Sequence, residues 1–350
     1  MAETTVLATP LCDRLGIRVP IVQAPIGSAA TPQLVAAVTD AGGLGMLALT
    51  WVTGQQALDR IRRVRQLTDG QFGVNLVLDF PIDDILDACL AEGVRVISTF
   101  WGDPARVTER VHAAGALHLH TVGTAEEARR VVDAGVDVVV AQGWEAGGHV
   151  WGQVSTMALV PAVVDAVQPV PVIAAGGIGD GRGLAAVLVL GAQAGWLGSR
   201  FLTAAEAATH EVYRRHVLAA APQDTVYTRC FDGGWPDAAH RVIRNSTIID
   251  WEAAGCPAAQ GRPGEGEVVA TDRRSRPHLR YGDMIPAPGM TGDLEAMAMY
   301  AGQCVGVIHD VVPAAQIVAS VASQAARILA GFGTAAGGVG RSEDEQLHRR

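Results

Sequence analysis

The 350-residue sequence predicts an α/β protein built on a (β/α)8 barrel, with a smaller inserted segment of mostly helices and loops after the eighth strand. Eight short apolar runs alternate with helical segments as far as Phe201, which is typical of parallel strands covered by helices. The 41 glycines gather where these runs end, so the backbone can turn tightly there. A doubly wound open sheet shares the alternation, but it explains a count of eight less well. It also places a GxGxxG fingerprint after its first strand, and this chain has none there.

The elements follow in order from these runs and the segments between them. The expected strands are Pro20–Ala24, Gly45–Thr50, Phe72–Leu78, Val94–Phe100, Leu117–Val122, Val136–Gln142, Val170–Ala175 and Ala194–Phe201. The expected helices are Thr31–Ala41, Gly54–Leu67, Ile82–Ala91, Pro104–Ala114, Thr124–Ala134, Ala158–Ala166 and Gly181–Leu190. Several of these helices end in Ala-Gly, a usual stop signal, and Thr124 with Glu127 has the spacing of a capping box.

After Phe201 the alternation stops, which marks an insertion. Residues 210–290 mix polar and helical sequence with a Gly/Pro/Arg-rich stretch, and we expect them to form a lid domain over the barrel mouth. A partly mobile surface segment is the alternative interpretation. Helical patterns return at Gly292–Ala301 and Pro313–Ala330, so residues 1–209 and 291–331 are expected to form the barrel. Residues 332–350 have the composition of a disordered tail.

Composition narrows the class of protein. A formal charge of -9 with only 27 Lys+Arg argues against nucleic acid as a partner. No signal peptide or membrane-spanning run is evident, so we expect a soluble cytoplasmic protein, and a homodimer is compatible with the sequence. The five cysteines are scattered without metal-type spacing, which predicts reduced thiols and no metal site.

Two glycine-rich loops follow the seventh and eighth expected strands. Gly176 and Gly177 lie in AAGGIGDGRG, which opens a helix, and Gly198 and Ser199 end the eighth strand. Barrels of this kind often seat a phosphate between these two loops, on backbone N–H groups and a helix start. The Ser199 hydroxyl would be an extra donor. A tight turn that merely requires glycine is the alternative, and a sugar phosphate would suit the seat as well as a flavin.

One imidazole lies at the same end of the predicted barrel. His149 follows the sixth strand within AQGWEAGGHVWG, where flanking glycines let its ring reach over the barrel centre. Near neutral pH an imidazole can act as a base or as a hydrogen-bond donor. Glu145 could orient His149 or face solvent. Trp144 and Trp151 could wall an apolar substrate pocket or pack at the barrel rim.

Three amides stand in otherwise apolar strands. Asn75 interrupts FGVNLV, and a buried amide must find hydrogen-bond partners. A polar ring edge in the barrel mouth or a neighbouring loop would supply them. Gln142, at the end of the sixth strand, follows the same reasoning. Gln23, which ends the first strand, could face either the mouth or a helix.

With these residues in place, the chain resembles the nitronate monooxygenase family, FMN-dependent barrel enzymes formerly called 2-nitropropane dioxygenases. The resemblance runs through most of the chain, in PIVQAP, DAGGLGMLA, FGVNL, DAGVDVVVAQGWEAGGH, AAGGIGDGRGLAAVLVLGA with GSRFL, and AGQCVG. It implies His149 as the catalytic residue and FMN contacts from Ala24, Asn75, Gln142, Gly176, Gly177, Gly198 and Ser199. Ile26 and Gly179 stand where the family often has methionine, which bears on the substrate.

The activity that this resemblance implies is the oxidation of alkyl nitronates by O2 to a carbonyl compound and nitrite. Flavin-dependent enoyl-ACP reductases and NADH:quinone reductases share the glycine loops and the histidine. An NAD(P)H-dependent FMN reductase of quinones or enoyl thioesters is therefore the second hypothesis. A phosphate-binding barrel without redox turnover is the third, and a colourless protein that rejects FMN would support it.

Overall fold

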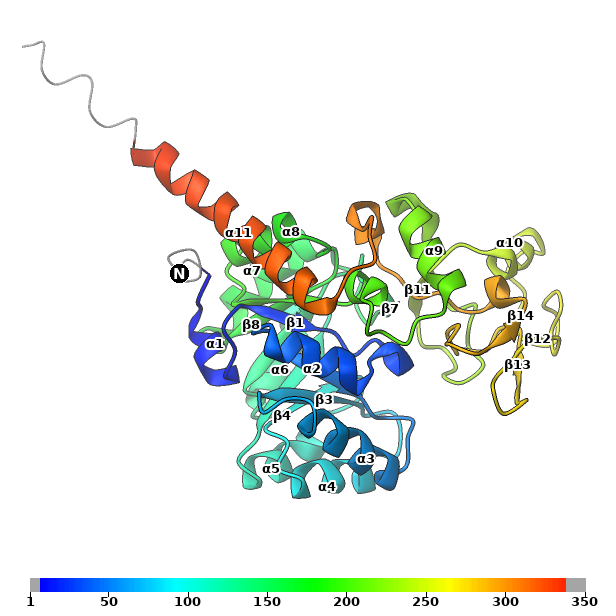
Figure 1. Cartoon of the computed structure of the whole chain (residues 1–350), viewed down its shortest axis with the longest axis horizontal. Helices are drawn as coiled ribbons and strands as arrows, with labels where there is room; N and C mark the ends of the chain where they lie inside the picture. The colour runs from blue at the N-terminus through cyan, green and yellow to red at the C-terminus, as the bar shows by residue number, and fades with distance from the viewer. Residues whose placement is uncertain (1–6, 338–350) are drawn as a thin grey trace, which may run out of the picture.

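The computed structural model describes residues 7–337, and it confirms the predicted barrel (Figure 1). The strands are β1 (Ile21–Gln23), β2 (Gly45–Ala48), β3 (Phe72–Val77), β4 (Val96–Phe100), β5 (Leu117–Val122), β6 (Val138–Gln142), β8 (Val172–Ala175) and β9 (Ala194–Leu197). They form one parallel sheet in the order β1-β9-β8-β6-β5-β4-β3-β2. A parallel bridge between Val22 and Leu44 joins its two end strands, so the sheet closes on itself.

The predicted helices lie between the strands, with bounds that differ by a few residues. They are α2 (Pro32–Asp40), α3 (Gly54–Arg65), α4 (Asp83–Ala91), α5 (Ala105–Ala113), α6 (Ala125–Asp133), α7 (Thr156–Val167) and α8 (Gly181–Val189). The side chain of Thr124 accepts from the N–H of Glu127, as predicted for the start of α6. The Glu127 carboxylate accepts from Gly123 and Trp151 instead of Thr124, so the predicted capping box is only half formed.

Alternate residues of each strand pack in different layers, as a parallel barrel requires. One set, including Met46, Leu119 and Trp196, fills the interior together with α1 (Pro10–Leu15). The other set packs against the surrounding helices. The backbone N–H of Leu11 donates to Gln193, just before β9, so α1 closes the amino ends of the strands. The carboxyl ends are left as the mouth.

The inserted segment contains helices, loops and two small antiparallel sheets, and the sheets were not predicted. Its helices are α9 (Glu211–Ala219) and α10 (Ser246–Ala253). One sheet joins β10 (Thr225–Thr228), β11 (His240–Ile243) and β7 (Gly148–His149), and the other joins β12 (Val268–Thr271), β13 (Pro277–Leu279) and β14 (Thr291–Gly292). Figure 1 shows the segment beside one end of the barrel.

The helix expected at Gly292–Ala301 is wrong. Thr291 and Gly292 pair with β12, and the N–H of Asp293 donates to Val269, so strand pairing overrides the helical pattern. A short 3-10 turn, η5 (Leu294–Ala296), and extended chain follow. Further 3-10 turns are η2 (Gly27–Ala29), η3 (Ser199–Thr203), η4 (Pro222–Asp224) and η6 (Gln303–Val307).

The last helix, α11 (Ala314–Gly337), packs against α8 and α2. It therefore extends into the first residues of the expected tail, 332–350, and residues 338–350 lie outside the part of the chain that is described. Between residues 7 and 337, no helix is long and apolar enough to cross a lipid bilayer. The same residues contain no cluster of three side chains that could hold a metal ion.

Candidate active site

The two glycine loops lie side by side at the barrel mouth. In the parallel register Ala175 of β8 stands opposite Trp196 of β9, so the loops that follow these strands are neighbours. Gly176 and Gly177 have φ values of 101° and 73°, in the left-handed region that side chains rarely adopt. The prediction that these two loops share one edge of the sheet is therefore confirmed by the strand register.

The backbone N–H groups of these loops fit an anion. Within residues 7–337, those of Gly176, Gly177, Gly198 and Ser199 donate to no protein acceptor. The start of α8, expected to add free donors, does not: Asp180 accepts from the N–H groups of Arg182 and Gly183, and Gln324 accepts from that of Gly181. The seat is thus made by the loops, and unpaired amides of this kind bind phosphate.

Ser199 and Ala24 border this seat. The Ser199 hydroxyl accepts from the N–H of Gly302 at 2.9 Å and also hydrogen-bonds the Cys304 thiol, so contacts with η6 and the residue before it hold the hydroxyl at the edge of the seat. The N–H of Ala24 donates to Leu197 at 2.8 Å, which places the loop after β1 against the end of β9. A Cβ at Gly198 would lie 3.5 Å from the Cβ of Ala24. The loops after β1 and β9 therefore meet at the edge of the seat.

His149 lies on β7, which pairs with β11 of the insertion, so that His149 stands opposite His240. Its ring centroid is 4.3 Å from that of Trp235 and 5.5 Å from that of Tyr300. The Nε2 atom is buried and has no hydrogen-bond partner among the described residues. Burial, with a smaller contribution from His240, lowers the pKa of His149 to about 3. The imidazole is therefore neutral at pH 7, and its Nε2 is available for a hydrogen bond to a ligand.

The predicted amides divide into two groups. The side chain of Gln142 donates to the carbonyl of His149 at 3.0 Å and accepts from Trp151, so it holds the His149 loop. The Gln23 amide exchanges hydrogen bonds with the backbone of Met46, which ties β1 to β2. These contacts give both glutamines backbone partners within the protein.

Asn75 is different, because no described residue bonds to its side chain, although it is only 7% exposed. It alternates with the outward-packing Val74 and Leu76 and therefore faces the barrel interior. Ser98 stands beside it in the register, and its hydroxyl is buried without a partner. Unpaired polar groups cost stability unless something binds them. Together the side chains of Asn75 and Ser98 fit the polar edge of a ligand ring. The sequence alone did not indicate Ser98.

The loop before His149 is held by backbone contacts. Glu145 accepts through its carboxylate from the N–H of Thr156 at the start of α7, at 3.0 and 3.1 Å. Its carbonyl accepts from Gln303. Glu145 thus links the His149 loop to the start of α7. A Cβ on Gly147 would come within 2.3 Å of the backbone nitrogen of Gly302.

This close approach makes Gly147→Ala a test of the loop's role. Since backbone atoms of Ala301 and Gly302 cannot move aside cheaply, we expect the loop to shift and turnover to fall about a hundredfold. Steady-state kinetics of the purified variant and the wild-type protein would measure this. In the neighbouring control, Gly148→Ala, the Cβ would meet no atom within 4 Å, so only the strain at φ 78° remains, about 1 kcal/mol. Equal activities of the two variants would contradict the assignment.

Residues of the insertion complete the site, and the sequence did not indicate them. Arg241 is 2% exposed and donates to the carbonyl of Trp144 at 3.0 Å. Its guanidinium carbon lies 4.6 Å from the centroid of the Trp144 indole. Trp144 therefore packs under the insertion, whereas Trp151 contacts Trp101 at 4.6 Å between centroids. Trp235 packs against Trp101 as well as His149. No spacing connects these residues in sequence, because only the β7–β11 pairing brings them together.

Comparisons with known proteins extend over the barrel and the insertion alike. The sequence model of the family described as nitronate monooxygenase matches residues 8–88 and 80–324. The (3aS,4S,5R,7aS)-5-hydroxy-7a-methyl-1-oxo-octahydro-1H-indene-4-carboxyl-CoA dehydrogenase of Mycobacterium tuberculosis is 34% identical over 342 residues, covering 90% of this chain and 95% of that protein.

Two solved structures are similar at comparable identity. FabK from Thermotoga maritima has a TM-score of 0.81 and 33% identity, over 94% of this chain and 99% of that one. The nitroalkane oxidase from Streptomyces ansochromogenes has a TM-score of 0.77 and 32% identity, over 93% of this chain and all of that one (100%). Both similarities span the complete arrangement of barrel and insertion.

Proposed function

The chain belongs to the nitronate monooxygenase family, and from this premise we propose that this oxidoreductase binds FMN and oxidises alkyl nitronates with O2. The products would be a carbonyl compound and nitrite. Two nitronates and one O2 yield two carbonyls and two nitrites, so atoms and charge balance. The observation that carries the proposal is the group of unpaired amides at the ends of β8 and β9 beside the unpaired Nε2 of His149. The named nitroalkane oxidase among the similar structures supports the substrate class.

The residues present fit FMN in two places. The N–H groups of Gly176, Gly177, Gly198 and Ser199 would hold its phosphate. Asn75 and Ser98 would hydrogen-bond the polar edge of its ring, and Ala24 and Gln142 would border it. Bound FMN supplies the acceptance of electrons from the substrate and their transfer to O2. The protein supplies binding, orientation and electrostatics.

His149 would act on the nitro group of the substrate. Its low pKa makes it a poor base at neutral pH, since efficient bases have pKa values near the working pH. We therefore propose that the preformed nitronate anion is the direct substrate and that the neutral imidazole donates a hydrogen bond to a nitro oxygen. Trp235 and Tyr300 pack about the ring and exclude water, which strengthens such a bond.

A second candidate is an NAD(P)H-dependent FMN reductase of quinones or enoyl thioesters. The observation that favours it is the similarity to FabK and to a dehydrogenase named for a carboxyl-CoA substrate. In that case His149 would face the carbonyl of the acceptor.

Anaerobic mixing separates the two functions. The FMN-loaded protein is mixed with a nitronate, with NADH or with NADPH, and the flavin absorbance is followed. We expect the nitronate to bleach the flavin rapidly, and nitrite to form when air is admitted. Rapid bleaching by a pyridine nucleotide, with no nitrite from nitronate under air, would overturn the proposal in favour of the reductase.

A further inference from the structure

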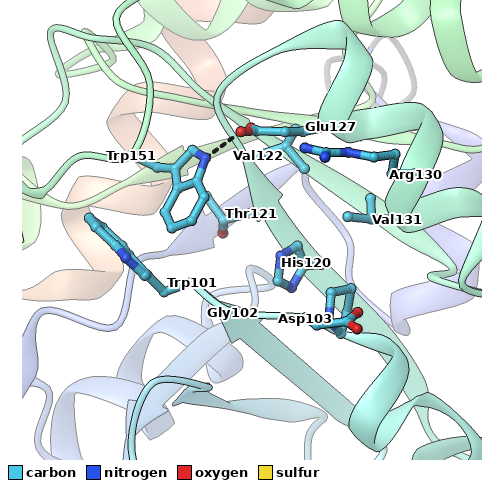
Figure 2. A pocket seen from close by; sticks show the side chains of 11 residues that line it. Trp101, Gly102, Asp103, His120, Thr121, Val122, Glu127, Arg130, Val131 and Trp151 are labelled. Atoms are coloured by element: carbon cyan, nitrogen blue, oxygen red, sulfur yellow. Dashed lines mark hydrogen bonds between the residues drawn. The ribbon is translucent and has the colours of Figure 1, made fainter.

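A cavity of about 340 Å³ lies beside the mouth, outside the flavin seat. It is bounded by β5, α6 and the loop after β4. Figure 2 shows the indoles of Trp101 and Trp151 at one side and Asp103 and Arg130 at the opposite side. Its volume is in the range of small-molecule sites. Trp101 separates the cavity from His149, and the centroids of these two rings are 6.3 Å apart.

The wall nearest His149 has a strained backbone. Trp101 has a φ of 60°, and a bulky residue in the left-handed region costs about 1 kcal/mol or more. Its ring meets that of Trp151 edge to face, at 85°. Glu127 accepts from the indole N–H of Trp151 and so fixes the second ring, as the dashed line in Figure 2 shows. Both indoles are therefore held in place before any ligand arrives.

A chain of hydrogen bonds fixes the proton positions of the histidine that lines the cavity. The Thr108 hydroxyl donates to the carbonyl of Pro104 at 2.9 Å, so it must accept from Nδ1–H of His118. The neutral His118 then has a lone pair on Nε2, which accepts from the Thr99 hydroxyl at 2.7 Å. The oxygen of Thr99 in turn accepts from Nδ1–H of His120 at 2.7 Å.

This series of hydrogen bonds ends at an acceptor in the cavity wall, the Nε2 atom of His120. His120 carries its hydrogen on Nδ1, so Nε2 has a lone pair, and no residue between 7 and 337 bonds to it. Burial lowers the pKa of His120 to about 3, which keeps the ring neutral. Asp103 adds a second acceptor, since only one of its oxygens is engaged, by the N–H of Ala105. The ligand must therefore be a donor of hydrogen bonds.

The charged groups and aromatic rings of the cavity wall further restrict the chemistry of the ligand. Asp103 and Glu127 outnumber Arg130 in the wall, which disfavours a phosphate inside the cavity. Flat rings stack on indoles, by roughly 1–3 kcal/mol per base, and carboxylates accept from ribose hydroxyls in nucleotide sites. We propose that this cavity binds the nucleoside part of a further ligand, with its heterocycle against Trp101 and Trp151 and its ribose hydroxyls on His120 and Asp103. The proposal goes beyond the flavin function and does not depend on it.

Calorimetric titration with adenosine of the purified protein, both without added FMN and after addition of FMN, tests this site. We expect saturable binding of one adenosine, and binding of 2′,3′-dideoxyadenosine that is about tenfold weaker, because the hydroxyl donors are missing. His120→Asn keeps a donor toward Thr99 and removes the Nε2 acceptor. It should weaken adenosine binding about tenfold and abolish most of the difference between the two ligands.

Two further variants distinguish loss of the binding site from loss of the fold. Asp103→Asn retains an acceptor for the N–H of Ala105 and should weaken adenosine several-fold. The exposed Arg129 lies on α6 but does not line the cavity, so Arg129→Ala should have no effect. Displacement of adenosine by NADH would assign the nucleoside to a dinucleotide, whose adenosine keeps both ribose hydroxyls. Displacement by CoA, whose ribose carries a 3′-phosphate, would contradict the argument that the cavity disfavours phosphate. Absent saturable binding, equal affinity for the dideoxy compound, or release of FMN by adenosine would overturn the proposal.

Discussion

Replacing His149 with alanine is expected to leave FMN bound and to lower turnover about a thousandfold. The proposed phosphate seat lies on the loops after β8 and β9, whereas His149 lies on β7, which pairs with β11 of the insertion. Loss of the imidazole therefore removes the hydrogen bond to the substrate without removing a phosphate donor. The measurements are the flavin content of the purified variant and its steady-state rate of nitrite formation from a nitronate.

A matched control distinguishes this role from a general effect of losing a histidine. His278 on β13 also has a buried, unpaired Nε2, but it lies in the other small sheet, away from the mouth. His278→Ala should retain both flavin and activity. If His149→Ala instead lost its flavin, or kept wild-type turnover, the residue would be structural and the assignment wrong.

Acidification is expected to destabilise the protein well above the pH at which carboxylates titrate. Burial lowers the pKa values of His118, His120, His149 and His240 to about 4, about 3, about 3 and about 4, from the ordinary 6.5. Because the folded-state pKa values are depressed, the unfolded chain binds protons first, and stability falls as the pH drops below 6.5. Between pH 7 and pH 5 each of the four imidazoles removes slightly under about 2 kcal/mol, so together they remove about 7 kcal/mol.

Urea unfolding at pH 7, 6 and 5 measures this loss. A fall of about 7 kcal/mol is a large part of the stability of an ordinary domain. His240→Asn, which can still donate to the carbonyl of Ala238, should be less stable at pH 7 but should lose about a quarter of the pH dependence. A stability that stays constant from pH 7 to pH 5 would show that these rings are not neutral and buried in solution.

Local patterns in the sequence predicted the barrel well. The strands are apolar runs bounded by glycine, and the parallel register then places Gly176–Gly177 next to Gly198–Ser199. Helix stops at Ala-Gly and the cap at Thr124 are likewise signals within a few residues. These features depend on short-range chemistry, which is why they could be predicted from the chain alone.

The structural features that were not predicted correctly depend on contacts between segments that are distant in the sequence. The apolar residues after Gly292 resemble a helix, but pairing with β12 holds the start of that segment extended. The contact of Trp235 with His149 exists only because β11 pairs with β7. Asp180 caps α8 and so removes the expected donors at the helix start, a local effect that Asp before the helix could have indicated.

Titration of the apoprotein with FMN and with riboflavin tests the central claim most directly, because the two ligands differ only in the phosphate. Four unpaired amides at the ends of β8 and β9 predict that FMN binds at least about a hundredfold more tightly. Gly198→Val, whose Cβ would make only ordinary contacts, should remove most of that preference, and Gly331→Val should not. Equal affinity of the wild-type protein for the two flavins would contradict the phosphate seat.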